Sequence, residues 1–309
     1  MPGEALRHGR SFWPAPAGGK AAVKALAFAV LAAAAHAPAA ASVAGPEPAY
    51  AIERTAVLSV KAADGHDYRV MVSWPATPPP PQGWPALYVL DGEDNFAIVT
   101  QTMRRLARAG ARSGAEDRLI VAIESGSLAR RVFDYTPAAP GWTIPAGAPA
   151  AGLPTGGAEA FLDFLSGRLM PELARRWSID PRRQAILGHS FGGLLTLDAC
   201  LTRPGMFETG IAVSPSLWFG GDLLANLEKA YARSPRSNGR LLIAAGGDER
   251  GALGGAPATE TARQLAGRLK ALDPPAQVAF IDLKGQGHGG TMLAALVPAL
   301  GFLSEGDRK

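Results

Sequence analysis

Short continuous runs of apolar residues recur along the chain, separated by longer segments of mixed composition. Such runs predict strands buried in a sheet, and the segments between them predict helices that cover it. Strands are expected at residues 55–62, 67–74, 86–90, 119–123, 185–187, 209–213, 241–245 and 277–283. Helices are expected from about residue 95 to 109, and at residues 159–177, 194–200, 222–232, 259–272 and 291–303. Two opening strands followed by this alternation predict an α/β fold, with a mostly parallel central sheet and helices on both faces.

One stretch carries the clearest chemical signal: residues 188–192, Gly-His-Ser-Phe-Gly, between a predicted strand and a predicted helix. This is the context of a nucleophile elbow, in which a sharp turn exposes a serine at the carboxyl edge of the sheet. We expect the turn to strain the backbone of Ser190, and side chains at positions 188 and 192 to clash with the neighbouring strand and helix. The alternative is an ordinary strand-to-helix turn with a capping serine.

A serine hydroxyl needs a base, usually histidine, and the chain has five histidines. His8 and His36 lie in a predicted leader. His66 lies in a hairpin turn that we expect to be away from the carboxyl edge, and the side chain of His189 is expected to point away from the approach to Ser190. His288 remains, on a glycine-rich loop after the last strand, where it can reach across the edge.

The acid that orients this histidine is expected after the strand at residues 241–245, where Asp248 and Glu249 both qualify. The residues alone leave the choice between them open. An oxyanion hole needs two backbone donors. One is the N–H of Phe191, next after the nucleophile, and the other is expected near Gly92 or Glu93.

Residues 285–290 also match a dinucleotide-binding glycine pattern, but too little chain follows for the second strand that a cofactor needs. A single cysteine, Cys200, excludes an intrachain disulfide and a multi-cysteine metal site. No P-loop or His-Glu-x-x-His motif is present. We therefore predict no cofactor and no resident metal.

The first 44 residues are typical of a targeting segment, with a basic start, an apolar core at residues 25–35, and Ser42-Val43-Ala44 as a small-residue cleavage site. We expect residues 1–44 to be a signal peptide or N-terminal leader and residues 45–309 to be the catalytic domain. The mature chain would then be periplasmic or secreted and would lack a stable membrane span. An uncleaved anchor is the alternative.

Charge excludes one class of partner. The chain carries 31 basic and 27 acidic residues, a formal charge of +4, and most of that excess lies in the leader. The remainder is nearly neutral, so nothing favours a nucleic-acid partner. Residues 125–155 form a long segment rich in proline and glycine, which we expect to be a loop that shapes a binding pocket.

The chain resembles the esterase D-like family of α/β-hydrolases, and within it most resembles periplasmic siderophore esterases that cleave catecholate trilactones such as enterobactin and salmochelin. The stretches that carry the resemblance are Leu90-Asp91-Gly92, residues 131–137, Ile179-Asp180-Pro181, residues 187–193, residues 214–218, residues 248–251 and Gly287-His288. The resemblance implies an α/β-hydrolase fold over roughly residues 50–303.

The resemblance also implies roles for individual residues. Ser190 would be the nucleophile and His288 the base, with Glu249 favoured as the acid. The N–H of Glu93 would be the second oxyanion donor. Arg131 would contact substrate, since a guanidinium can pair and stack with an anionic aromatic ligand.

Two of the three expected substrate contacts have alternatives. Arg131 is as well explained as a residue that orders its loop by pairing with Asp134. Tyr135, in the same segment, is a candidate substrate contact. Trp218 either lines the acyl pocket or packs beneath it.

The sequence thus predicts a serine carboxylester hydrolase that acts on a small-molecule ester, with a ferric or iron-free catecholate siderophore as the favoured substrate. The alternatives are a general carboxylesterase, thioesterase or acyltransferase of the same family, and a non-catalytic siderophore-binding protein.

Overall fold

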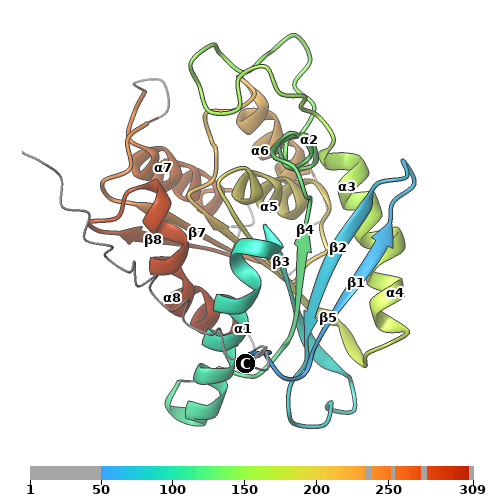
Figure 1. Cartoon of the computed structure of the whole chain (residues 1–309). Helices are drawn as coiled ribbons and strands as arrows, with labels where there is room; N and C mark the ends of the chain where they lie inside the picture. Colours follow the sequence, from blue (N-terminus) through green and yellow to red (C-terminus); the bar gives the residue numbers. More distant parts are fainter. Residues whose placement is uncertain (1–49, 114, 234–238, 252–254, 273–276, 306–309) are drawn as a thin grey trace, which may run out of the picture. The chain divides into compact units, whose positions relative to one another are not determined.

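The computed structural model describes residues 50–113, 115–233, 239–251, 255–272 and 277–305 (Figure 1). The predicted leader, residues 1–44, lies outside these residues. The strands are β1 Thr55–Lys61, β2 Asp67–Ser73, β3 Trp84–Leu90, β4 Leu119–Glu124, β5 Ile179–His189, β6 Thr209–Val213, β7 Arg240–Gly246 and β8 Gln277–Leu283. The α-helices are α1 Gly92–Ala109, α2 Leu128–Tyr135, α3 Ala158–Phe164, α4 Met170–Ala174, α5 Phe191–Thr202, α6 Leu223–Arg233, α7 Ala258–Lys270 and α8 Thr291–Glu305. Short 3-10 turns lie at Gly110–Arg112 and His288–Gly290.

The strands described form one sheet in the order β1-β2-β4-β3-β5-β6-β7-β8. β1 pairs with β2 and β2 with β4 in antiparallel fashion, and every other pair in the sheet is parallel. The predicted mostly parallel sheet is therefore confirmed. The parallel strands end at one edge, where the loops after β3, β5, β7 and β8 meet.

Alternating side chains of the central strands serve two apolar layers, as expected for strands buried on both faces. Leu87 and Val89 of β3 pack with residues of α1 and α8, whereas Tyr88 and Leu90 pack with residues of α2 to α5. A third cluster joins α5, α6 and α7 to β7 through residues such as Ile243. Figure 1 shows α1 and α8 on the near face of the sheet and the other helices behind it.

Three predictions about local structure are wrong. The predicted loop at residues 125–155 contains the helix α2, which begins after Ser127, whose hydroxyl accepts a hydrogen bond from the N–H of Arg130 at 3.1 Å. The predicted helix at residues 159–177 is interrupted by a π-helical turn at Leu165–Leu169. β5 begins at Ile179, well before the apolar run that predicted it. The first residues of this strand are partly exposed and mostly polar, so the prediction missed them.

His66 is also placed differently from its prediction. Because β2 runs antiparallel to β4, with Arg69 opposite Glu124, the β1–β2 hairpin lies at the carboxyl edge and not away from it. The Nε2 atom of His66 lies 3.1 Å from the carbonyl oxygen of Ser125, and its ring makes an edge contact with Tyr68 at 4.6 Å between centroids. Through these contacts His66 joins the β1–β2 hairpin to the segment before α2.

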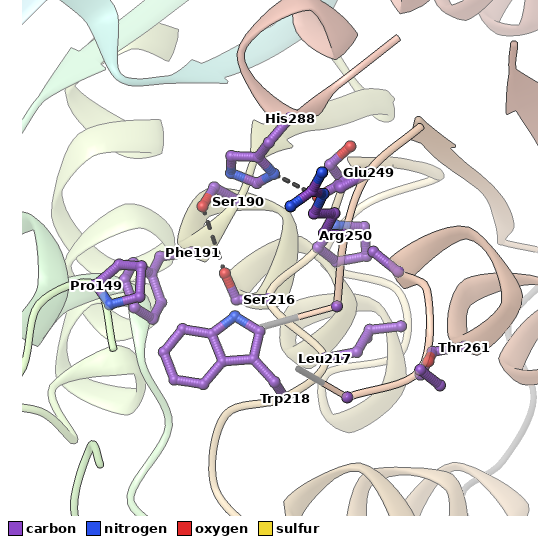
Figure 2. Close-up of a pocket in the computed structure, with 16 residues that line it drawn as sticks. Pro149, Ser190, Phe191, Ser216, Leu217, Trp218, Glu249, Arg250, Thr261 and His288 are labelled. Carbon is purple, nitrogen blue, oxygen red and sulfur yellow. Dashed lines mark hydrogen bonds and ion pairs between the residues drawn. The ribbon is translucent and has the colours of Figure 1, made fainter. Parts of the chain in front are cut away.

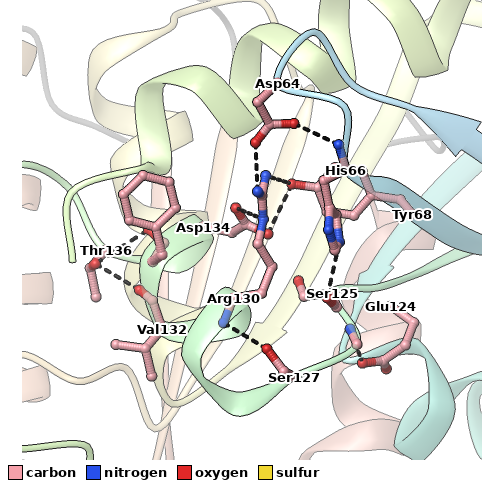
Figure 3. Close-up of polar contacts among 12 residues, drawn as sticks. Asp64, His66, Tyr68, Glu124, Ser125, Ser127, Arg130, Val132, Asp134 and Thr136 are labelled. Carbon is pink, nitrogen blue, oxygen red and sulfur yellow. Dashed lines mark hydrogen bonds and ion pairs between the residues drawn. The ribbon is translucent and has the colours of Figure 1, made fainter. Parts of the chain in front are cut away.

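A partly buried polar cluster holds α2 against the same hairpin (Figure 3). Arg130 Nε lies 2.8 Å from Asp134 Oδ1, and Arg130 Nη1 lies 2.5 Å from Asp64 Oδ2. The Tyr68 hydroxyl donates to Asp134 Oδ2 at 2.9 Å. Burial raises the pKa of Asp134, with the charge and hydrogen bonds of Arg130 and Tyr68 acting against that rise. The position of α2 therefore depends on Arg130, whose positive charge balances the carboxylate of Asp134, a residue that is only 1% exposed.

We expect Arg130→Met to lower the free energy of unfolding by about 3 kcal/mol, because it leaves the Asp134 carboxylate buried without a cation. The double variant Arg130→Met/Asp134→Asn removes the uncompensated charge and should recover most of that loss. Urea unfolding of the two variants and the wild type measures both values. A double variant no more stable than the single one would show that the charge is not the cause.

Candidate active site

Ser190 occupies a strained backbone conformation between the end of β5 and the start of α5. Its φ is 59° and its ψ is −119°, a region that residues with side chains rarely adopt. Backbone hydrogen bonds hold it there: its N–H donates to Val213 O at 3.0 Å, and its carbonyl accepts from the N–H groups of Leu194 at 3.0 Å and Ser216 at 3.1 Å. The neighbouring strand β6 and the loop after it thus fix the turn predicted as a nucleophile elbow.

Glycines make this turn possible, though not quite as the pattern predicts. A Cβ at Gly188 would lie 2.2 Å from Gly192 O, a clear clash within the elbow itself. A Cβ at Gly192 would meet Leu90 Cδ1 at 3.3 Å, which is tight contact and not the clash predicted. Gly193 is the more restricted position, since a Cβ there would lie 2.9 Å from Val213 O. Close approach to β6 therefore requires the third glycine of the stretch.

His288 and Glu249 come together from separate loops. Nδ1 of His288 contacts Glu249 Oε1, and the N–H of Gly246 donates to the other carboxylate oxygen at 3.3 Å. Glu249 is 7% exposed, whereas Asp248 is exposed. Burial opposes ionisation of Glu249, but the hydrogen bond and charge of His288 and the hydrogen bond from Gly246 act against it, and the pKa of Glu249 is lowered. Of the two acids left open by the sequence, the structure brings Glu249 to His288.

His189 supports the loop that carries His288, a role that the sequence did not indicate. Its Nε2 lies 3.1 Å from the carbonyl oxygen of His288 and 3.1 Å from Thr291 Oγ1. The two imidazole rings lie 4.7 Å apart. Burial, aided by the neighbouring charge of His288, lowers the pKa of His189 to about 4. His189 is therefore neutral at pH 7 and donates to the backbone of the His288 loop.

A cavity of about 490 Å³ opens beside these residues (Figure 2). In Figure 2 the ring of His288 lies between Ser190 and Glu249 at one end of the cavity. Ser190 Oγ lies 3.4 Å from Ser216 Oγ, a polar partner that the sequence did not single out, although its Ser-Pro-Ser segment follows a strand at the same edge. The remaining wall is largely apolar or small: Pro149, Phe191, Pro215, Leu217, Trp218, Gly251, Gly255, Ala256 and Ala258. Trp218 thus lies on the pocket wall.

The two predicted oxyanion donors differ in their surroundings. Phe191 begins α5 and lines the cavity next to Ser190, so its N–H belongs to the first turn of a helix. The N–H of Glu93 donates to Glu124 Oε2 at 3.0 Å, and the Glu93 side chain forms an ion pair with Arg69. Gly92 is buried at the start of α1. The second donor therefore stays a prediction, and at Glu93 it requires displacement of the Glu124 carboxylate.

Arg131 and Tyr135 bind Asp91 and do not line the cavity. Arg131 holds Asp91 through two hydrogen bonds of 2.5 and 2.8 Å, and it also donates to His189 O at 3.3 Å. The alternative pairing of Arg131 with Asp134 is wrong, because Arg130 takes that carboxylate. Tyr135 is fully buried, and its hydroxyl accepts from the N–H of Asp91 at 3.2 Å, so the prediction that it contacts substrate is wrong.

These contacts give Arg131 and Tyr135 a positioning role. Asp91 has a φ of 56°, unusual for a residue with a side chain, and it directly precedes α1. Arg131 links it to the backbone of the elbow through the carbonyl of His189. The loop after β3 and the elbow after β5 are thereby held in one arrangement by a helix that the sequence did not predict.

Within the described residues, no group of three or more His, Cys, Asp or Glu side chains is arranged to hold a metal ion. In the same residues, no helix combines the length and apolar character needed to cross a bilayer. The one free thiol, Cys200, lies behind the elbow on α5, and burial raises its pKa to about 12.

A family model described as "Putative esterase" matches residues 62–269. The ferri-bacillibactin esterase BesA of Bacillus subtilis (strain 168) is 31% identical over 274 residues, which cover 85% of this chain and 94% of that protein. A solved structure of the enterobactin and salmochelin hydrolase IroE is 27% identical, with a TM-score of 0.63 over 81% of this chain and 94% of that one.

The crystal structure of the BES protein from Bacillus cereus has a TM-score of 0.74 at 23% identity and covers 84% of this chain and 98% of that one, which supports the fold alone. These similarities, together with the mostly parallel sheet, confirm the predicted α/β-hydrolase fold.

We expect stability to fall as the pH falls from about 7 to about 4 because of His189. An unfolded histidine takes up a proton near pH 6.5, whereas folded His189 does so only near pH 4. Between these values the unfolded state binds more protons, so acid favours unfolding, by about 3 kcal/mol from this residue. His189→Gln, whose amide can still donate to His288 O, should show a shallower dependence in urea unfolding at a series of pH values. Equal slopes for variant and wild type would contradict this account.

Proposed function

This chain belongs to the esterase family whose model it matches, and from that membership we propose that it is a serine carboxylester hydrolase with Ser190, His288 and Glu249 as its catalytic triad. One observation carries the proposal. The Glu249–His288 pair and the strained Ser190 come from three separate loops and line the same end of one cavity. A turn that merely capped a helix would need neither the strain nor the pair.

The geometry supports a defined sequence of proton transfers. Because Nδ1 of His288 faces Glu249, Nε2 is the ring nitrogen left to act as base. Ser190 Oγ attacks the ester carbonyl, its proton passes to His288, and His288 then protonates the departing alkoxide. Water attacks the acyl-enzyme by the same route in reverse, which releases the acid and returns the proton to Ser190.

The Glu249 carboxylate has two tasks in this cycle. It holds the imidazole with Nε2 toward Ser190, and it stabilises the imidazolium that forms during attack. The lowered pKa of Glu249 keeps it ionised at neutral pH. The developing oxyanion would be met by the N–H of Phe191 and by a donor from the loop after β3.

We propose a catecholate trilactone siderophore as the substrate, with ferric and iron-free forms both considered. The support is the resemblance of the elbow and of residues 131–137 to siderophore esterases, and the naming of the relatives as a ferri-bacillibactin esterase and an enterobactin and salmochelin hydrolase. Trp218 and Phe191, which line the cavity, supply aromatic surface for a planar ring.

We propose further that the chain is exported, on the basis of the basic start, apolar core and small-residue site within residues 1–44. Such an enzyme would act in the periplasm or outside the cell. N-terminal sequencing of the mature protein should begin at Gly45, and a mature protein that retains Met1 in the cytoplasm would overturn this part of the proposal.

A panel of four proteins tests the triad: wild type, Ser190→Ala, Glu249→Gln and Asp248→Asn, assayed with p-nitrophenyl butyrate. We expect kcat to fall about 10⁶-fold in Ser190→Ala and about 10³-fold to 10⁴-fold in Glu249→Gln, because each removes a group that acts as part of one unit. Asp248→Asn is the matched control, since it changes the adjacent, exposed acid, and should stay within about twofold of wild type. A larger loss in Asp248→Asn than in Glu249→Gln would overturn the assignment of the acid.

The same panel tests the substrate by mass spectrometry after incubation with an iron-free and an iron-loaded catecholate trilactone. Linear trimer or monomer products that vanish in Ser190→Ala support the siderophore assignment. Turnover of p-nitrophenyl butyrate alone would keep the triad and remove the trilactone. Binding of the trilactone without turnover of either compound would favour a non-catalytic siderophore-binding protein.

A further inference from the structure

One charged side chain on the cavity wall has no task in the chemistry described above. Three lining residues have ionisable side chains that bear on charge in the pocket: Glu249, His288 and Arg250. The first two are paired with each other. Arg250 is exposed, and within the described residues it makes no ion pair or side-chain hydrogen bond. The residues that follow, 252–254, are Ala-Leu-Gly and contain no acidic side chain that could neutralise it.

The other arginine near the site is differently placed. Arg131, which the resemblance suggested as the contact for an anionic substrate, already holds Asp91 through two hydrogen bonds and is absent from the cavity wall. Its charge is therefore largely matched within the protein. Arg250 directly follows the triad acid and lies with it on the wall that faces the cavity, as Figure 2 shows.

The walls around Arg250 are suited to an aromatic group. Trp218 and Phe191 contact each other edge to face at 5.8 Å between ring centroids, and both line the cavity together with Leu217. Such walls bury a planar apolar ring, whereas a guanidinium supplies forked donors for a carboxylate or a pair of phenolate oxygens. A ligand that satisfies both features carries an anionic oxygen on an aromatic ring.

We propose that Arg250 is a specificity-determining residue that binds an anionic substituent on the aromatic part of the ester held in this cavity. The inference rests on the proposed function, because it concerns the substrate of the Ser190 site. It adds to that function the residue that binds the negative charge on the aromatic part of the substrate, whether that charge is a carboxylate or an ionised catechol. The residue takes no part in proton transfer.

Two matched p-nitrophenyl esters test the inference, those of 3-(4-carboxyphenyl)propanoic acid and 3-(4-methylphenyl)propanoic acid. They differ in charge at one ring position and share the scissile bond. The quantity measured is the ratio of kcat/KM for the carboxylate ester to that for the methyl ester. Arg250→Gln should lower this ratio about fivefold to tenfold, and Arg250→Lys should lower it less, since it keeps the charge and loses the fork.

Arg182→Gln is the control for loss of one positive charge. Arg182 is 78% exposed near the amino end of β5, at the edge of the sheet opposite Ser190, and should leave the ratio unchanged. In wild type, 0.5 M NaCl should lower the ratio and should have no such effect in Arg250→Gln, because salt screens an exposed charge.

The outcomes separate this inference from the proposed function. If Arg250→Gln lowers kcat/KM for both esters by the same factor, or leaves both unchanged, Arg250 does not read the anion and the inference is wrong while the esterase stands. If the wild-type protein hydrolyses neither of these esters nor p-nitrophenyl butyrate, the proposed function fails and the inference fails with it.

Discussion

The strained backbone of Ser190 is the constraint on which the site depends. A positive φ at a residue with a side chain costs on the order of 1–3 kcal/mol and persists only where its surroundings hold it. Here β6 does so through Val213 O, and the loop after it through the N–H of Ser216, while Gly193 allows the close approach to β6 that those bonds need. The strained turn also has a chemical consequence. It lifts the hydroxyl to the edge of the sheet and leaves the N–H of Phe191, at the start of α5, beside the reacting atom.

A second set of contacts fixes the neighbouring loops relative to that turn. Arg131 joins Asp91, after β3, to the carbonyl of His189, and His189 in turn donates to the carbonyl of His288, after β8. The loops after β3 and β8 are thus both tied to His189, the residue that precedes Ser190. The same surroundings explain why half-buried His189, which does not line the cavity, stays neutral: a protonated imidazole there would lose hydration and add charge between Arg131 and His288.

The sequence predicted the sheet well because strands buried on both faces leave a clear apolar signature, as residues 86–90 and 209–213 do. It missed the first half of β5, where polar residues such as Arg182 and Arg183 precede the apolar run, since that signature marks only the doubly buried part. It missed α2 for a different reason. That helix has eight residues and is held by ion pairs to Asp64, Asp91 and Asp134. Two of these partners lie on other elements, so composition within residues 125–155 carried no sign of them.

Pairs of similar residues that are adjacent in the sequence show why the sequence alone could not assign every site residue. Asp248 and Glu249 have nearly the same chemistry, and so do Arg130 and Arg131, yet within each pair the two side chains face different neighbours. Which acid reaches His288 is decided by the turn after β7, where the N–H of Glu249 donates to Gly246 O. The two arginines also meet carboxylates far away in the sequence: Arg131 pairs with Asp91, 40 residues away, and Arg130 with Asp64, 66 residues away. Motifs identify the kinds of residue that a reaction needs. The three-dimensional contacts determine which of those residues already have partners, and therefore which side chains a substrate can meet.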